Sequence, residues 1–293
     1  MGIDVNAILS NAKQLKDSCS PVIPTASNPG LSLGVLLGTC QKHGRDKITF
    51  VLSSSIGSFG LWLEQLIAES TGKEGRGLIP VERETTGTPQ EYNDDRVFVH
   101  TYLASDNNEY DVRKISDLEK AGHPVVRIEL SDKLALGGEF FRWEIAIAIA
   151  GMMMNLNPFN EPNVAESKKN TDNQLEDWKR NGVFQKENPI VKVGDISICG
   201  KVLEDQIKND DSSLHNAFSV FAALTQSHDY IALLPYFMLT EQRLHILQNW
   251  RLQLRAKLKI ATTLLTGPRY LHSTGQLHKG GPPTGLYIIL IGE

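Results

Sequence analysis

The sequence predicts an α/β fold with a doubly wound, largely parallel sheet, and two observations carry this prediction. Segments of strand character and segments of helix character alternate along the chain. The strand-like segments are short and rich in β-branched residues, whereas the longer segments between them repeat their apolar residues with helical periodicity. Such an alternation is typical of a parallel sheet with helices on its faces.

The first half of the chain contains three expected strands, each followed by an expected helix. In chain order these pairs are Lys47–Ser53 with Ile56–Ser70, Arg96–Leu103 with Asp111–Ala121, and Pro124–Leu130 with Gly137–Asn155. The last helix is apolar on most of its faces, which predicts that it is buried.

A polar stretch, Glu166–Asn188, interrupts the alternation, and we expect it to form a helix and a linker. We therefore place a domain boundary near residue 185, with an α/β domain in residues 1–185 and a C-terminal α/β region in residues 186–293. The expected elements of that region are a weak strand, a helix, a strand, a long helix and a final strand, in residues Ile196–Val202, Leu214–Gln226, Tyr230–Leu239, Glu241–Thr266 and Tyr287–Ile291.

The composition bounds the class of protein. The chain has 293 residues, of which 41% are hydrophobic, and this is enough for one large or two medium domains. Its net charge of −4 and the lack of a basic stripe argue against a nucleic-acid partner. The first twenty residues do not resemble a signal peptide, and the longest apolar run, Ile145–Met154, is about half as long as a membrane span requires. These observations predict a cytoplasmic protein without a membrane partner.

The cysteines indicate neither a disulfide framework nor a cysteine zinc site. There are three, Cys19, Cys40 and Cys199, and none belongs to a C-x-x-C pair. An odd and low count in a chain of this length is typical of reduced thiols. We expect all three to be reduced and mostly buried.

The segment Trp62–Gly77, WLEQLIAESTGKEGRG, holds the first candidate for chemistry. On a helix, Gln65 and Glu69 share one side because they are four residues apart. Glu69 falls in the last turn, before Gly72 as the expected C-cap, and the helix dipole there should raise the pKa of a carboxyl group. A base that removes a proton next to a carbonyl benefits from such a shift. A solvated surface glutamate is the alternative.

Two further segments carry candidate residues. In Asn157–Lys168, NPFNEPNVAESK, a structured turn leads to Lys168 near the start of a helix, where a surface lysine is the alternative. Gly267–Gly281, GPRYLHSTGQLHKGG, joins a helix to a strand and contains His272 and His278. Loops of this kind line the ligand crevice of α/β sheets, and His272 could act as an acid or base near neutral pH. A metal site would need a third ligand, and none is evident.

A fourth segment, Ser53–Gly57, joins a strand to a helix and could bind phosphate through backbone N–H groups. It has neither a Walker pattern nor the glycine fingerprint of dinucleotide-binding proteins, so a dinucleotide enzyme has no support here.

Taken together, the segments WLEQLIAESTGKEGRG, NPFNEPNVAESK and GPRYLHSTGQLHKGGPPTG resemble the phosphoglucose isomerase family. They are most similar to the glucose-6-phosphate isomerase portion of bifunctional transaldolase/glucose-6-phosphate isomerases. The resemblance implies a sugar-isomerase (SIS) fold, which is a flavodoxin-like three-layer α/β/α sandwich. It also implies aldose–ketose isomerisation of glucose 6-phosphate and fructose 6-phosphate through a cis-enediol, without a cofactor.

The resemblance also implies roles for single residues. Glu69 matches the base that moves the proton between C2 and C1, and Lys168 matches the lysine near the ring oxygen. His272 is the candidate for the histidine that assists ring opening, with His278 as the alternative. The expected substrate-binding residues are Gln65, Lys73, Gln276 and His278.

The chain departs from the family pattern in two respects. Its candidate residues follow the order Glu69, Lys168, His272, whereas the histidine of ordinary phosphoglucose isomerases lies between the glutamate and the lysine. The Gly-Gly-Arg motif that precedes the glutamate in the family does not occur here. We therefore expect a fragment that lacks an upstream SIS domain and any transaldolase domain, and that has little activity alone.

Two readings of the complete site follow from the sequence. The leading one is a sugar-phosphate isomerase, with a homo-oligomer as a possible assembly. The rival is a non-catalytic sugar-phosphate-binding module on the same fold, which would have no use for a proton shuttle.

Overall fold

The computed structural model describes residues 2–183, 188–204, 206–207 and 213–292. The chain forms two compact units, of which the first comprises Met1–Asn163 with His228–Glu293 and the second Val164–Ser227. The boundary expected near residue 185 falls within the sequence range of the second unit, at residues 184–187, which lie outside the described residues. The compact units thus divide the chain at other places, and the division at residue 185 stays a prediction.

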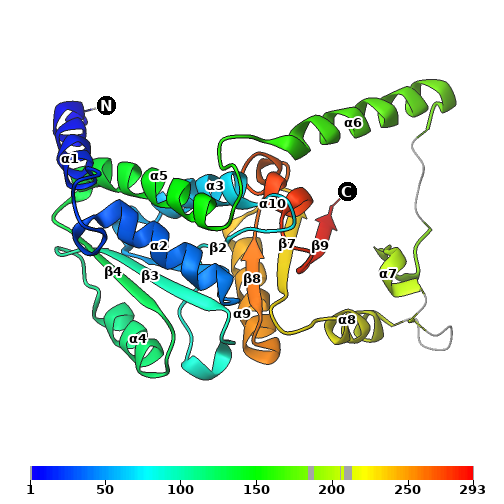
Figure 1. Cartoon of the computed structure of the whole chain (residues 1–293). Coiled ribbons are helices and arrows are strands. Elements are labelled where there is room, and N and C mark those ends of the chain that lie inside the picture. Colours follow the sequence, from blue (N-terminus) through cyan, green and yellow to red (C-terminus); the bar gives the residue numbers. More distant parts are fainter. Residues whose placement is uncertain (1, 184–187, 205, 208–212, 293) are drawn as a thin grey trace. The chain divides into compact units, whose positions relative to one another are not determined.

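A four-stranded parallel sheet organises the first unit (Figure 1). Its strand order is β2-β1-β3-β4, and Lys47 of β1 pairs with Ile79 of β2 and with Arg96 of β3. The strands are β1 (Lys47–Leu52), β2 (Ile79–Val81), β3 (Arg96–Leu103) and β4 (Val125–Leu130). The predicted α/β class with a mainly parallel sheet is therefore confirmed.

Helices cover both faces of this sheet, as alternation along β3 requires. Val97 and Val99 join a core with helices α2 (Pro29–Lys42), α3 (Phe59–Thr71) and α5 (Leu136–Met153). Phe98 points to the opposite face and packs with α4 (Glu109–Lys120). Helix α1 (Val5–Ser18) lies on α5. The result is a three-layer α/β/α arrangement.

A second parallel sheet in the same unit has the order β8-β7-β9. Its strands are β7 (Tyr230–Tyr236), β8 (Ala261–Leu264) and β9 (Gly285–Ile291), and helix α9 (Glu241–Leu258) connects β7 to β8. One buried cluster contains Ile79 and Val81 of β2 together with Tyr230 and Ala261. The C-terminal strands therefore share a core with the edge of the first sheet.

The expected long helix Glu241–Thr266 is wrong in its last third. The helix ends at Leu258 because Lys259 adopts a left-handed conformation with φ of 60°. The next residues form β8, whose three buried positions pair with β7. Sequence periodicity missed this strand because it is short and follows the helix with almost no turn signal.

The second unit contains most of α6 (Pro162–Asn181), a small antiparallel pair β5 (Val191–Val193) and β6 (Ile196–Ile198), and helices α7 (Lys201–Glu204) and α8 (Leu214–Ala223). The short helical elements of the first unit are η1 (Thr25–Ser27), η2 (Ser54–Ile56), η3 (Pro89–Glu91), η4 (Lys133–Ala135), η5 (Arg269–His272) and α10 (Gly275–Gly280).

The cysteines are free, as expected, but they are not mostly buried. Cys19 and Cys40 are half-buried and Cys199 is exposed. Across the described residues, no helix is long and apolar enough to cross a membrane.

Candidate functional site

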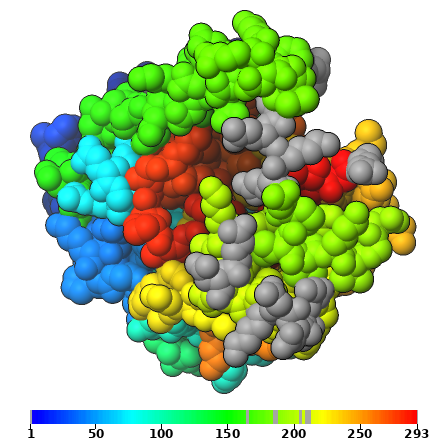
Figure 2. All heavy atoms as spheres, turned by 90° about the vertical axis from the view of Figure 1, so that its right-hand side faces the viewer, coloured from blue at the N-terminus to red at the C-terminus, as the bar shows by residue number. Residues whose placement is uncertain are grey.

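The candidate site lies at the C-terminal end of α3, where the segment Gly267–Gly281 packs against the helix. The helix ends at Gly72, whose N–H donates to the carbonyl of Ala68, so the predicted C-cap is confirmed. A Cβ atom on Gly72 would lie 2.3 Å from Cα of Leu277 in α10. Only a glycine therefore permits this close approach. Figure 2 shows the surface of the α3 end (cyan) beside that of the α10 segment (orange-red).

Glu69 is half-buried in the last turn of α3, and exposed Gln65 donates to it from one turn earlier, with Nε2 3.4 Å from Oε2. Partial burial raises the pKa of Glu69, and the neighbouring Glu161 adds to this, whereas Gln65, His272 and Lys73 act in the opposite direction. The net shift is upward, toward the range that suits a base at neutral pH. The structure thus brings three predicted residues, Gln65, Glu69 and His272, to one place.

The two histidines of the segment Gly267–Gly281 differ in environment. His272 ends η5 and is exposed, near enough to Glu69 to act on the pKa of that carboxyl group. His278 lies between two tyrosines, with its ring centroid 5.5 Å from that of Tyr270 and 4.9 Å from that of Tyr287. Burial lowers the pKa of His278 to about 4, so this imidazole is neutral and a weak base at pH 7.

Gln276 is buried, and its side-chain amide links three segments of the chain through hydrogen bonds. Its Nε2 donates to the carbonyl oxygen of Gly72 at 2.9 Å and to Oδ1 of Asn163 at 2.7 Å. The side chain therefore connects α10 to the end of α3 and to the start of α6. This geometry describes a structural contact, and a contact with substrate stays a prediction.

Lys73 is also buried, with its side chain fully shielded from solvent. Its ammonium donates to the carbonyl oxygen of Asn157 at 3.0 Å, to Oδ1 of Asn160 at 3.2 Å and to the carbonyl oxygen of Asn160. Arg76 adds a bond from Nη1 to the carbonyl oxygen of Met154 at 2.6 Å. The loop that follows Glu69 thus holds the end of α5 and the NPFN turn, a pairing that residue spacing alone could not show.

Lys168 is exposed on α6, in the second unit. The structure gives no distance from this ammonium group to Glu69, and the predicted role of Lys168 stays a prediction.

Two of the three serines of the segment Ser53–Gly57 donate hydrogen bonds to side chains of a neighbouring loop. Oγ of Ser53 donates to Oδ1 of Asn108 at 2.7 Å, and Oγ of Ser55 donates to Oδ2 of Asp106 at 2.6 Å. These bonds connect the loop after β1 to the loop after β3. Phosphate binding there stays a prediction.

Two buried carboxyl groups near the site were missed by the sequence interpretation. Glu64 lies on the buried side of α3, and Glu82 directly follows β2. Burial raises the pKa of both groups, that of Glu82 to about 7. The spacing of Glu64 with Ile67, Ala68 and Thr71, which are all buried, is the helical signal that could have revealed it.

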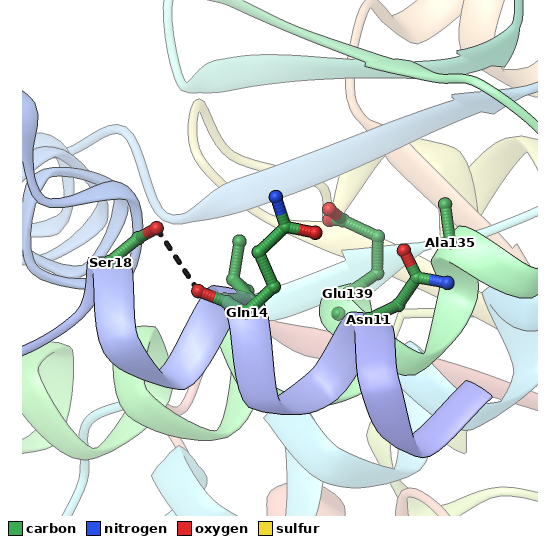
Figure 3. A pocket seen from close by; sticks show the side chains of 7 residues that line it. Asn11, Gln14, Ser18, Ala135 and Glu139 are labelled. Atoms are coloured by element: carbon green, nitrogen blue, oxygen red, sulfur yellow. Dashed lines mark hydrogen bonds between the residues drawn. The ribbon is translucent and has the colours of Figure 1, made fainter. Parts of the chain in front are cut away.

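A separate hollow of about 170 Å³ lies between α1 and α5 (Figure 3). Its lining is Asn11, Gln14, Leu15, Ser18, Ala135, Gly138 and Glu139. None of the predicted site residues lines it. Within the described residues, no group of three or more His, Cys, Asp or Glu side chains is arranged to hold a metal ion.

Several curated proteins that are similar to this chain are named glucose-6-phosphate isomerase. No family model matches the chain. A glucose-6-phosphate isomerase of Methanocaldococcus jannaschii is 27% identical over 205 residues, which are 58% of this chain and 50% of that protein. One of Lactobacillus helveticus is 23% identical over 205 residues, covering 58% and 46%. One of Mycoplasmopsis pulmonis is 27% identical over 146 residues, covering 37% and 34%. The chain spans about half the length of the curated relatives it matches.

Proposed function

We propose that this chain carries the proton-transfer part of an aldose–ketose isomerase site that interconverts glucose 6-phosphate and fructose 6-phosphate. One observation carries the proposal: Glu69 is half-buried at the end of α3, its pKa is raised by that burial, and exposed His272 lies within electrostatic reach. The similarity to curated relatives named glucose-6-phosphate isomerase supports it.

The chemistry assigns a task to each group. The proton at C2 becomes acidic once the sugar ring is open and the neighbouring carbonyl is polarised. A carboxylate that is partly withdrawn from water can take this proton, leave a cis-enediol and return the proton to C1. Glu69 is the proposed base, and Gln65 orients its carboxylate through the hydrogen bond within α3.

Ring opening needs a group that exchanges protons with the ring oxygen and with the hydroxyl on C1. We assign this task to His272, because its imidazole is exposed whereas His278 is half-buried between tyrosines, where its pKa is lowered to about 4. Lys168 is proposed to lie near the ring oxygen. Lys73 and Gln276 hold the loops of the site, and contacts of Lys73, Gln276 and His278 with the sugar phosphate are part of this proposal.

Since the chain spans about half the length of its curated relatives, we further propose that phosphate binding requires residues outside it. An upstream SIS domain, with or without a fused transaldolase domain, would supply them. On this proposal the chain alone turns over sugar phosphates slowly, because stabilisation of the enediolate charge accounts for orders of magnitude in rate.

The test is the substitution Glu69→Gln in the full-length protein that contains this chain. Removing the base should lower isomerisation, and the exchange of the C2 proton in deuterated water, by at least about a hundredfold. The matched control is Glu74→Gln, which neutralises an exposed glutamate in the loop that follows.

Retained exchange in Glu69→Gln would remove Glu69 from the mechanism. Binding of glucose 6-phosphate by the unmodified protein without any exchange at C2 would instead favour the non-catalytic sugar-phosphate-binding module.

A further inference from the structure

The residues on both sides of His272 face one buried carboxyl group on α3. Nη1 of Arg269, three residues before the histidine, lies 3.5 Å from Oε1 of Glu64. Ser273, directly after the histidine, is buried, and its hydroxyl is near enough to lower the pKa of Glu64 although the two groups do not meet at hydrogen-bond geometry. Glu64 is therefore the point on α3 toward which the histidine segment converges.

The same helix also carries Glu69. The two glutamates are five residues apart, so their side chains leave the helix axis in directions that differ by about 140°. Glu64 points into the packed interior and Glu69 toward the solvent-accessible edge. A contact of His272's neighbours with Glu64 consequently fixes the histidine relative to Glu69 through one rigid element.

The segment has further attachments on both sides of His272. Beyond His272, Gln276 and Leu277 pack on Gly72, and the N–H of Gly75 donates to the carbonyl oxygen of Gly280 at 2.9 Å. Before it, Tyr270 is buried and its hydroxyl accepts from that of Tyr236 at 3.0 Å. Arg269 and Ser273, the two residues that face Glu64, stand three residues before and one residue after the imidazole-bearing residue.

Burying a glutamate side chain costs folding free energy because its carboxyl group loses contact with water. The interactions of Glu64 offset only part of this cost. Its Oε2 has no hydrogen-bond partner, and the charges that act on it are those of Arg269, Arg83 and Arg251. A leucine at this position would avoid the desolvation cost. The presence of a carboxyl group here therefore calls for a reason other than stability.

We propose that Glu64 is a positioning residue for His272, and that its carboxyl group holds Arg269, beside buried Ser273, so that the imidazole stays beside Glu69. This inference rests on the proposed isomerase function for its kinetic consequence. Its structural content, the placement of one histidine by one glutamate, can be measured in the chain itself.

The kinetic test uses Glu64→Gln, which keeps the shape of the side chain and removes its charge, in the full-length protein. We expect kcat for isomerisation to fall about tenfold while KM stays within about twofold, because misplacing a catalytic group by less than an ångström affects the transition state most. Glu64→Asp, which keeps the charge, should recover part of the loss. The control Glu144→Gln changes an exposed glutamate on α5 and should leave both parameters unchanged.

Arg269→Gln offers a second variant, because Arg269 is exposed enough for the protein to tolerate its loss. If the two residues act as a unit, the double variant should be no slower than the slower single variant. Independent, multiplying losses in the double variant would contradict the proposal, as would full activity in Glu64→Gln.

The structural test follows the imidazole signals of His272 and His278 by NMR in this chain, with the His272 signal assigned from His272→Gln. Glu64→Gln should shift or broaden the His272 signal and leave that of His278 in place. An unchanged His272 signal would overturn the positioning role whether or not the full-length protein is an isomerase. A full-length protein without isomerase activity would instead defeat the proposed function alone.

Discussion

Two clusters of charge in the first unit are built on opposite principles. Around α9, Arg251 and Arg255 are buried and their guanidinium groups are bound on several sides, with Nη2 of Arg251 2.7 Å from the carbonyl oxygen of Thr262 and Nη1 of Arg255 3.5 Å from Oε2 of Glu84. Around the end of α3, Glu69 is partly open to solvent and buried Glu64 is only partly paired.

The difference teaches how to separate charges that hold a fold together from charges that are available for chemistry. In the α9 cluster, Arg255 also pairs with Glu91 and Arg96 also pairs with Glu84, so Glu84 is shared by two arginines. Such a set can contribute to a unique packing, and its buried acid Glu84 is already paired with two cations, although Nε of Arg96 and Nε of Arg255 have no hydrogen-bond partner. The carboxylates at the end of α3 still have oxygen atoms that can accept a hydrogen bond or a proton. Proton transfer requires such atoms.

The largest expected effect comes from breaking the closed cluster. Arg255→Met would leave Glu84 and Glu91 without one of their cations inside the protein, and we expect the free energy of unfolding to fall by about 3–5 kcal/mol. Urea unfolding measures this loss, and Lys257→Met, which removes an exposed cation of the same helix, should change stability by less than about 0.5 kcal/mol. A loss below about 1 kcal/mol in Arg255→Met would show that the cluster is not the tight network described here.

A substitution at Gly72 would disturb the region around the end of α3 by displacing the backbone that packs on it. In Gly72→Ala, the added methyl group would meet the backbone of Leu277, so α10 must move away. We expect about 1–3 kcal/mol of destabilisation by thermal unfolding. In the full-length protein we also expect a fall in kcat, because His272 belongs to the displaced segment. Unchanged stability would mean that α10 does not pack as closely as the structure shows. Gly122→Ala, at an exposed turn with φ of 92°, separates crowding from simple backbone strain, because a Cβ there meets no neighbouring atom.

A smaller, pH-dependent effect is expected at Glu82, on the border between the two regions. Burial raises the pKa of Glu82 to about 7, so the folded state holds a proton that the unfolded state has already lost between about pH 4.5 and pH 7. Stability contributed by this group is therefore present below pH 4.5 and declines as the pH rises through 7. In Glu82→Gln that decline should disappear.

The variant should then gain about 1–2 kcal/mol over the natural protein at pH 8 and almost nothing at pH 4, as measured by urea unfolding at both values. Glu144→Gln serves as the exposed control. If the difference in free energy of unfolding between the variant and the natural protein is the same at both pH values, Glu82 ionises in the folded protein at an ordinary pKa.

Much of the first unit could be predicted from the sequence, because local residue patterns indicate many of its strands and helices. The expected strand Arg96–Leu103 has the bounds of β3, and the expected end of the first long helix at Gly72 is also correct. Strand β2 was missed because only three residues, Ile79–Val81, pair with β1, which is too short for any periodicity. Strand β8 was absorbed into a helix for the same reason.

The site was less predictable, since its geometry depends on contacts between distant segments. Gln65 and Glu69 share a side of one helix, so helical spacing was enough to pair them. The burial of Lys73 depends on carbonyl groups of Asn157 and Asn160, and that of Glu64 on the segment of Arg269. No pattern within a single segment contains such information, and this is why the burial of Lys73 was not foreseen and Glu64 was overlooked.

The buried ammonium of Lys73 has a practical consequence for anyone who modifies this protein chemically. Desolvation lowers the pKa of Lys73, which on its own would make the amine a better nucleophile, but the turn at Asn157 and Asn160 encloses it. Acylating and methylating reagents will therefore pass over Lys73 and label exposed amines such as that of Lys168. Lys73 and Lys168 thus differ in chemical accessibility, and a spectroscopic tag can be attached to Lys168 without modifying Lys73.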